Sequence, residues 1–172
     1  MKKLVLVFAI FVSLTSIAQS KIGHVNTQKL LDTLPSRKAA MIQIQDFEKR
    51  GMEELKEMET ELQKKYSKYM SEQASLTPVL KQYEEEQLQK KQQAMQQREQ
   101  ELQQKMQQLG NELNEPILKR VKKAIEIIAG RKKLNYVVDE TSTLYFAGGS
   151  DITNEVMNEL LKLDTIEAPL KK

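Results

Sequence analysis

Two long amphipathic segments, separated by one break near residues 71–78, take up most of residues 36–131 of this 172-residue chain. An α-helix rises about 1.5 Å per residue, so the first segment alone would reach roughly 60 Å, about twice the diameter of a small domain. Long helices gain most of their stability from packing an apolar face, which predicts assembly with further copies or with a large partner. Little chain remains for an enclosed catalytic core, so the sequence favours a protein that holds or spans something over an enzyme.

The break is predicted to be the tip of a helical hairpin that covers residues 36–116. Pro78 disfavours helix at Thr77 and lacks a backbone donor, and several serine and threonine residues lie close by. A reversal at residues 71–78 would let the strand-like segments at both ends of the chain meet in one body. The alternative is a single kinked helix.

The two arms of this hairpin carry different apolar stripes. In the first arm, Phe47, Met58 and Tyr69 recur every eleven residues, a period that predicts a straight or slightly right-handed stripe. In the second arm, twelve of the 27 residues from 82 to 108 are glutamine. Apolar residues recur there every seven positions, at Leu88, Met95, Leu102 and Leu109. A narrow stripe on a polar rod suits a loosely packed antiparallel pair of helices.

The chain outside the hairpin, residues 19–35 and 117–166, is predicted to form a small β body with docking helices. The predicted fold class is therefore α+β, with a small antiparallel β body and a long protruding α-helical hairpin. A sheet this small is marginal in water, so several copies are expected to share it. Residues 167–172 are expected to be a disordered tail.

Three strands are predicted for this body. Residues 22–26 form the first, and residues 134–138 and 142–146 alternate in polarity as the two strands of a hairpin should. Asp151 is a suitable N-cap for a final helix. The residues expected to form the body and its contacts between copies are Ile22, Val25, Ile117, Val121, Ile125, Ile128, Leu134, Tyr136, Val138, Leu144 and Phe146.

The first eighteen residues have the features of a secretory signal peptide. Lys2 and Lys3 precede an apolar run, and Ser16 and Ala18 place small residues where a signal peptidase requires them. The mature chain is therefore expected to begin at Gln19, and an uncleaved membrane anchor is the alternative. The absence of cysteine excludes disulfides, thiol chemistry and a lipid-modified cysteine.

Charge excludes a nucleic-acid partner. The formal net charge of +3 includes Lys2 and Lys3, so without the signal peptide 25 basic residues face 24 acidic ones, or +1. Nucleic-acid binding would need a patch of one sign. One basic cluster consists of Lys119, Arg120, Lys122, Lys123, Arg131, Lys132 and Lys133. A weak contact with lipid or lipopolysaccharide is one interpretation of this cluster, and a solvated helix face is the other.

Catalytic and metal-binding constellations are not apparent in the sequence. His24 is the only histidine and falls in a predicted strand, so it is interpreted as an ordinary, partly buried side chain. The glutamates at residues 84–86 point to different faces of a helix, which favours a solvated charge run over a cation site. No cofactor and no enzymatic activity are predicted.

Several short segments follow one another in a recognisable order. They are Ile-Gly-His-Val-Asn at 22–26, Leu-Pro at 34–35, Leu-Lys-Glu-Met-Glu-Thr-Glu-Leu-Gln at 55–63, Pro-Ile at 116–117, Ala-Ile at 124–125, Tyr-Val-Val-Asp at 136–139 and Asp-Ile-Thr at 151–153. In this order and spacing they resemble the OmpH family of periplasmic chaperones. The resemblance covers the whole mature chain. It implies a periplasmic homotrimer whose helical arms enclose a cavity that holds unfolded outer-membrane proteins without ATP. A structural coiled-coil spacer or adaptor with a fixed cell-envelope partner is the alternative function.

Adaptable apolar side chains on the arms are the candidates for contacting such clients, since methionine and tyrosine suit varied partners. These residues are Met52, Met58, Tyr66, Tyr69, Met70, Tyr83, Met95 and Met106. The alternative is that each of them only packs one arm against the other. Known members of the family are markedly basic, whereas this chain is nearly neutral, so attraction of clients by charge is not expected.

Overall fold

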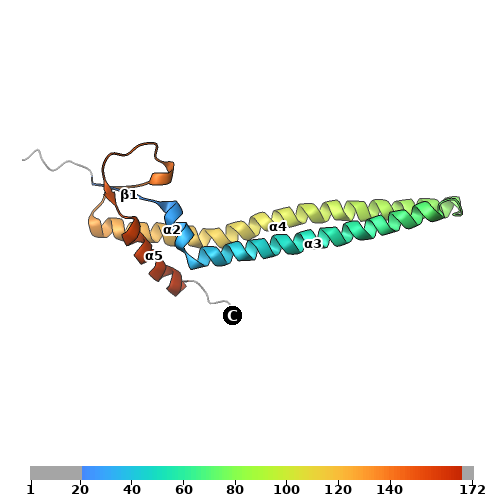
Figure 1. The fold of residues 1–172 in the computed structure, drawn as a ribbon, viewed down its shortest axis with the longest axis horizontal. Coiled ribbons are helices and arrows are strands. Elements are labelled where there is room, and N and C mark those ends of the chain that lie inside the picture. The colour runs from blue at the N-terminus through green and yellow to red at the C-terminus, as the bar shows by residue number, and fades with distance from the viewer. Residues whose placement is uncertain (1–20, 168–172) are drawn as a thin grey trace, which may run out of the picture. The chain divides into compact units, whose positions relative to one another are not determined.

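A computed structural model describes residues 21–167; the predicted signal peptide and almost all of the predicted tail lie outside this range. The elements are β1 (Ile22–Val25), α2 (Thr27–Thr33), α3 (Pro35–Glu72), α4 (Pro78–Lys132), β2 (Tyr136–Asp139), the 3-10 helix η1 (Glu140–Ser142), β3 (Ser150–Asp151) and α5 (Thr153–Glu167) (Figure 1). Two units are formed. The arm unit is Arg37–Pro116, and the body unit is made of the described parts of Met1–Ser36 and Ile117–Lys172. Long helices with a small sheet agree with the predicted combination of elements.

In the arm unit, α3 and α4 run side by side in opposite directions (Figure 1). The reversal lies between the last residue of α3, Glu72, and the first residue of α4, Pro78. Thr77 caps α4, because its carbonyl oxygen accepts from the Lys81 N–H at 2.9 Å and its hydroxyl from the Leu80 N–H at 3.4 Å. Proline fits the first turn of a helix because its missing N–H needs no partner there.

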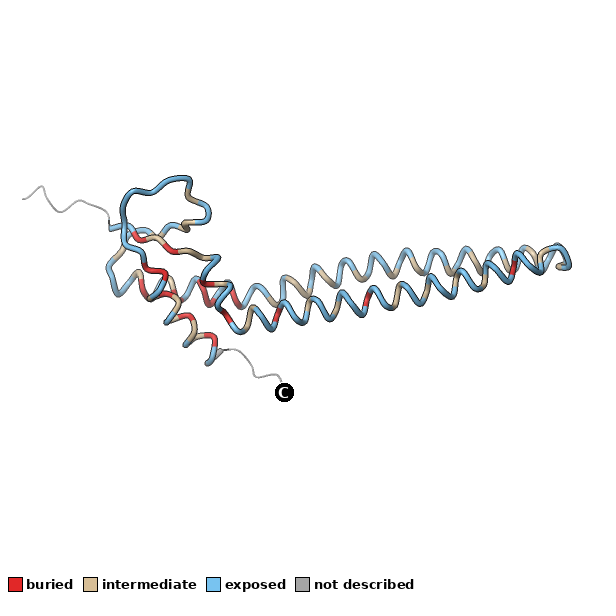
Figure 2. Tube along the Cα trace, viewed as in Figure 1, coloured by how far each residue is buried: buried red, intermediate tan, exposed pale blue. Residues whose placement is uncertain are grey.

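Ion pairs and one close approach fix how the two arm helices meet. The Arg98 guanidinium binds both carboxylate oxygens of Glu54, at 2.7 and 2.9 Å, and Lys91 pairs with Glu61 at 2.7 Å. The hydrogen bond from Arg98 holds the pKa of Glu54 below its ordinary value. Farther along the stripe, Gly51 is buried against Leu102. Few arm side chains are fully buried (Figure 2), so this pairing is thin rather than core-like.

Gly51→Leu is expected to push the arm helices apart. Even a Cβ at this position would lie 3.2 Å from a Leu102 methyl carbon, so a full leucine side chain overpacks the contact at a cost of about 1–3 kcal/mol. Thermal unfolding followed by far-ultraviolet circular dichroism measures the loss. Gly51→Ala is the control, because the flexible Leu102 side chain can give way and alanine favours helix. Equal melting of both variants would contradict the close approach.

The sheet of the body is parallel, and the predicted antiparallel hairpin is wrong. β1 lies in the middle of the order β2-β1-β3 and pairs in parallel with both neighbours. Only the first two predicted strands form. The predicted strand at 142–146 is instead part of η1 and the loop after it, so Leu144 and Phe146 are loop residues, and Ser150–Asp151 supplies the third strand.

Side-chain hydrogen bonds at the end of β2 explain this difference. The Asp139 carboxylate accepts from the Thr141 N–H at 3.1 Å, and its carbonyl oxygen accepts from the Thr143 hydroxyl at 2.6 Å. These bonds turn the chain into η1 instead of a tight hairpin. Residues 140–149 then carry the chain to the far side of β1, where β3 joins in parallel. The alternation of polar and apolar residues at 142–146 therefore belongs to an exposed loop and not to a strand.

The body unit buries a small apolar core beneath one face of this sheet. Its buried apolar residues are Val25, Leu30, Leu34, Ile117, Val121, Ala124, Ile128, Ile152, Val156 and Leu160. Three buried polar residues accompany them: Arg120, Thr153 and Asp164. The first-turn N–H of Ser36 donates to Asp164 at 3.1 Å, so this carboxylate satisfies a backbone donor at the start of α3.

Asp139→Asn is expected to destabilise the body by about 1–3 kcal/mol at neutral pH. Desolvation raises the pKa of Asp139, but hydrogen bonds from Thr141 and Thr27, including hydroxyl donors at 2.7 and 2.6 Å, outweigh it and lower the pKa overall. A lowered pKa in the folded state means that this stabilisation is present above about pH 4 and is lost as the pH falls through the folded value. Urea unfolding from pH 7 to pH 3 should therefore show the wild type and the variant converging in acid; a constant difference would contradict this role.

Candidate functional site

Four of the arm residues predicted to contact a partner are exposed in the structure. Met52, Tyr66, Met70 and Tyr83 leave between 52% and 58% of their surface open to solvent. Their neighbours Val79 and Leu80 at the start of α4 are exposed as well. Large apolar side chains in solvent cost hydration free energy unless a partner covers them, so these positions are available for binding.

The other four arm residues are less exposed. Met58, Met95 and Met106 are half-buried, and Tyr69 is buried. The Tyr69 hydroxyl donates to Glu85 at 2.5 Å, and this hydrogen bond raises the pKa of the tyrosine. The burial and the hydrogen bond of Tyr69 agree with the alternative interpretation of the sequence, in which this side chain packs one arm against the other.

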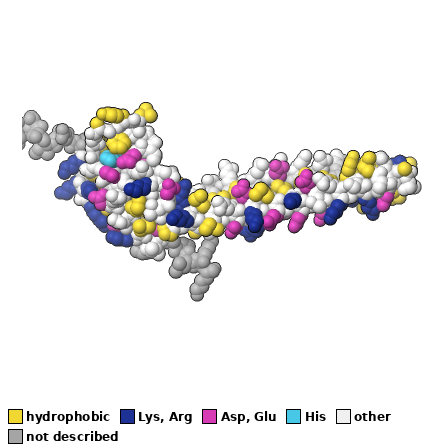
Figure 3. Space-filling view, viewed as in Figure 1, with side chains coloured by type: hydrophobic (Ala, Val, Ile, Leu, Met, Phe, Trp, Pro, Cys, Tyr) yellow, Lys and Arg dark blue, Asp and Glu magenta, His cyan; other side chains and the backbone are white. Residues whose placement is uncertain are grey.

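Shallow grooves connect several of these residues along the arm unit. One, of about 480 Å³, is lined by Leu62, Tyr66, Tyr69 and Leu88 together with glutamine and glutamate side chains. A second, of about 510 Å³, lies beside Gly51 and is open to solvent. Its apolar lining consists of Phe47, Met52, Leu55, Leu102 and Met106. Figure 3 shows the resulting surface, on which apolar patches alternate with charges of both signs.

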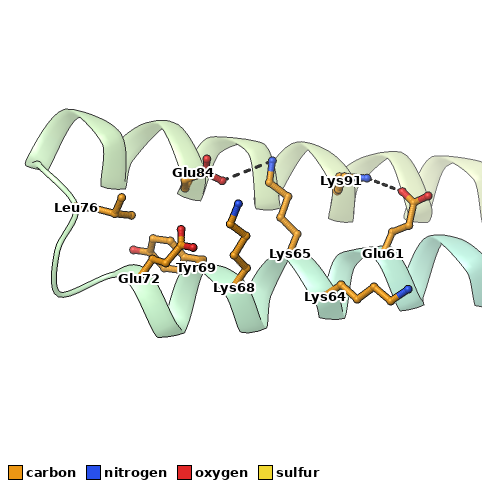
Figure 4. Close-up of a pocket in the computed structure, with 9 residues that line it drawn as sticks. All are labelled: Glu61, Lys64, Lys65, Lys68, Tyr69, Glu72, Leu76, Glu84 and Lys91. Carbon is orange, nitrogen blue, oxygen red and sulfur yellow. Dashed lines mark hydrogen bonds and ion pairs between the residues drawn. The ribbon is translucent and has the colours of Figure 1, made fainter.

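Near the tip, a third groove has a mixed and largely neutralised charge (Figure 4). Lys65 lies 3.6 Å from Glu84, and Lys91 lies 2.7 Å from Glu61. Lys64 and Lys68 line the same groove, where Glu72 supplies a further negative charge. Because acids and bases alternate, the arm surface has no single sign that would attract highly charged partners.

The body unit presents a second exposed apolar surface, on the sheet face away from its core. The register pairs Ile22 with Tyr136 and His24 with Val138, so these four side chains share one face. Ile22, Tyr136 and Val138 are exposed, and so are Leu144 and Phe146 in the following loop. Of the other residues predicted for the body, Val25, Ile117, Val121 and Ile128 are buried in its own core, and Ile125 and Leu134 are partly buried.

Sequence reasoning missed one polar cluster on that same face. His24 meets Glu140 and Asp151, although the three residues lie far apart in the chain. Only the parallel strand register brings them together, and the sequence did not predict that register. Within residues 21–167, none of the helices is both long and apolar enough to cross a membrane.

Comparison with known proteins identifies the family. The sequence model of the family described as outer membrane protein (OmpH-like) matches residues 21–160. The chain belongs to the OmpH-like family. Two similar proteins, each named chaperone protein Skp, come from Photorhabdus laumondii, at 27% identity over 143 residues, and Photorhabdus luminescens, at 28%. Each match covers 83% of this chain and 87% of the relative.

The fold of this OmpH-like protein also matches a solved one. A crystal structure of an OmpH-like protein from Caulobacter crescentus CB15 superposes with a TM-score of 0.73 and covers 84% of this chain and 86% of the other. Sequence identity in that match is 15%, so it speaks for the fold alone.

Proposed function

We propose that this OmpH-like protein is an ATP-independent periplasmic holdase chaperone, which binds unfolded outer-membrane proteins and prevents their aggregation. The observation that carries the proposal is the exposed apolar surface of the arm unit, formed by Met52, Tyr66, Met70 and Tyr83. Each contact it offers is small and adaptable, which suits retention of chains without a fixed structure. The relatives named chaperone protein Skp support the same activity.

The proposal includes a homotrimer whose arms surround the client. Ile22, Tyr136 and Val138 leave an apolar sheet face uncovered in a single chain, and a sheet of three short parallel strands has little stability by itself. Further copies of the chain that cover this face would solve both problems. Export to the periplasm rests on the signal-peptide features of residues 1–18.

A lipid or lipopolysaccharide contact through the basic cluster forms no part of the proposal. Arg131 pairs with Glu159 at 2.8 Å, Lys132 pairs with Glu155 at 2.5 Å, and Arg120 is buried beside Asp164. Lys119 and Lys123 also interact with other residues. Arg120 is therefore removed from solvent, and Arg131 and Lys132 already have carboxylate partners within the chain.

Light scattering of diluted, denatured β-barrel proteins tests the proposed function. With no nucleotide present, a stoichiometric amount of trimer is expected to suppress the aggregation of several unrelated barrels. Protection of none of them at excess would reject the holdase. Tight binding of a single folded envelope protein, without protection of unfolded chains, would favour the spacer or adaptor instead.

A further inference from the structure

The exposed face of the body sheet gathers a histidine and two carboxylates from three separate segments. β1 and β3 are paired so that His24 lies directly beside Asp151, and aligned residues of parallel neighbours point to the same face. On the other side, His24 is aligned with Val138 of β2, and Glu140 follows two residues later. Glu140 is the first residue of η1, and its carboxylate reaches His24 on this same face.

These three side chains converge on one point. His24 Nδ1 lies 2.5 Å from Glu140 Oε1, and one atom from each of the three residues falls within 4.8 Å of the other two. The histidine side chain is 12% exposed and the Glu140 side chain 21%. The Phe146 ring contacts the imidazole, with 4.8 Å between the ring centres and an angle of 35° between the ring planes.

Neighbouring groups orient both carboxylates by donating hydrogen bonds to them. The Asn26 side-chain amide donates to Glu140 Oε2 at 3.3 Å. The Thr153 N–H donates to Asp151 Oδ1 at 2.8 Å. The hydrogen bonds from Thr153 hold the pKa of Asp151 below its ordinary value, so this group remains a carboxylate at neutral pH. Oriented ligands of this kind are typical of metal centres.

We propose that His24, Glu140 and Asp151 bind a borderline divalent metal ion of the Zn²⁺ class. One imidazole nitrogen and two carboxylate oxygens make a mixed ligand set that such ions accept, and water would complete the coordination. Zinc takes ligands at about 2.0–2.2 Å, so neighbouring ligand atoms lie roughly 3.3 Å apart. The His24–Glu140 contact must open by less than an ångström and Asp151 must move closer, which side-chain rotation allows.

Binding exchanges a proton for the ion. In the structure, the 2.5 Å contact between His24 Nδ1 and Glu140 is a hydrogen bond, so one proton lies between these two atoms. The ion takes the place of this proton, which passes to solvent, and the imidazole binds through its free electron pair. The bound ion would clamp the two ends of the loop that carries Leu144 and Phe146.

Isothermal titration of the full, tag-free mature chain with ZnCl₂ tests the proposal. We expect one saturable site per chain at micromolar concentrations and none for MgCl₂. His24→Asn, Glu140→Gln and Asp151→Asn should each weaken the site at least about tenfold. Asparagine at 151 retains the cap on Thr153 and so leaves α5 intact. Glu53→Gln, at an exposed arm position, is the matched control and should bind as the wild type does.

A spectroscopic measurement on the unmodified protein keeps the proposal testable even if a variant fails to fold. His24 is the only histidine, so its imidazole resonances in an NMR spectrum report on this site alone. Stoichiometric Zn²⁺ is expected to shift them. Unchanged resonances, or wild-type affinity in the His24→Asn and Glu140→Gln variants, would show that His24 and Glu140 form only a hydrogen bond and would overturn the site.

Discussion

Arg120→Leu is expected to destabilise the body by about 3–5 kcal/mol, the usual cost of removing one partner from a buried ion pair. Arg120 is 6% exposed and Asp164 is 3% exposed. Their nearest atoms lie 3.2 Å apart, and the guanidinium also donates to the Ser36 hydroxyl at 3.2 Å. Without the arginine, the buried carboxylate would lose its ion-pair partner. Urea unfolding followed by circular dichroism measures the change.

Two controls distinguish the cost of an unpaired buried charge from the cost of lost packing. The double variant Arg120→Leu with Asp164→Leu removes both charges and should recover a large part of the lost stability. Lys122→Ala breaks an exposed pair with Glu126 at 3.9 Å and should change stability by less than about 0.5 kcal/mol. If Arg120→Leu itself costs less than about 1 kcal/mol, the pair contributes little to the body.

The second large effect is expected on activity. Changing Met52, Tyr66, Met70 and Tyr83 together to serine should reduce protection of unfolded barrel proteins at least about tenfold. Each side chain is roughly half exposed, so covering it with a client contributes on the order of 1 kcal/mol, and the four contributions accumulate. Aggregation assays over a range of chaperone concentrations measure the shift.

The folded arm should survive this change, because the buried Gly51 and Tyr69 and the ion pair of Arg98 with Glu54 between the helices stay in place. The matched control changes Gln93, Gln96, Gln100 and Gln104, which are exposed on α4 of the same unit, to serine. This control should protect clients as the wild type does. Equal protection by both variants would mean that clients are held elsewhere, whereas a loss in both would point to a general weakening of the arm.

Local signals predicted the helical part of the fold well. Proline and its serine and threonine neighbours marked the break after Glu72, and the apolar spacing on both arms reflects a narrow packed stripe. Arg120 was assigned to an exposed basic cluster and this was wrong. It lies three residues after Ile117 and four before Ala124, both buried, so helical periodicity already indicated a buried position.

The pairing and direction of the strands could not be predicted from short segments of the sequence. A parallel pairing joins Ile22 to Tyr136 across more than a hundred residues, and no local pattern states which strands will be neighbours. Alternation around Leu144 suggested a hairpin, but hydrogen bonds that the Asp139 side chain accepts from Thr141 favoured a turn. Because the strand register could not be predicted, the proximity of His24 and Asp151 could not be predicted either. That the exposed arm residues contact a client stays a prediction.

Site-specific photo-crosslinking tests most directly whether the arms hold unfolded chains. Tyr66→benzoylphenylalanine and Tyr83→benzoylphenylalanine place a reactive group on the exposed arm surface, and the same change at the exposed Tyr145 of the body is the control. With several unrelated unfolded barrel proteins and no nucleotide, we expect strong crosslinks from both arm positions and weak ones from the body. Crosslinks from the body alone, or from neither arm position, would contradict the account.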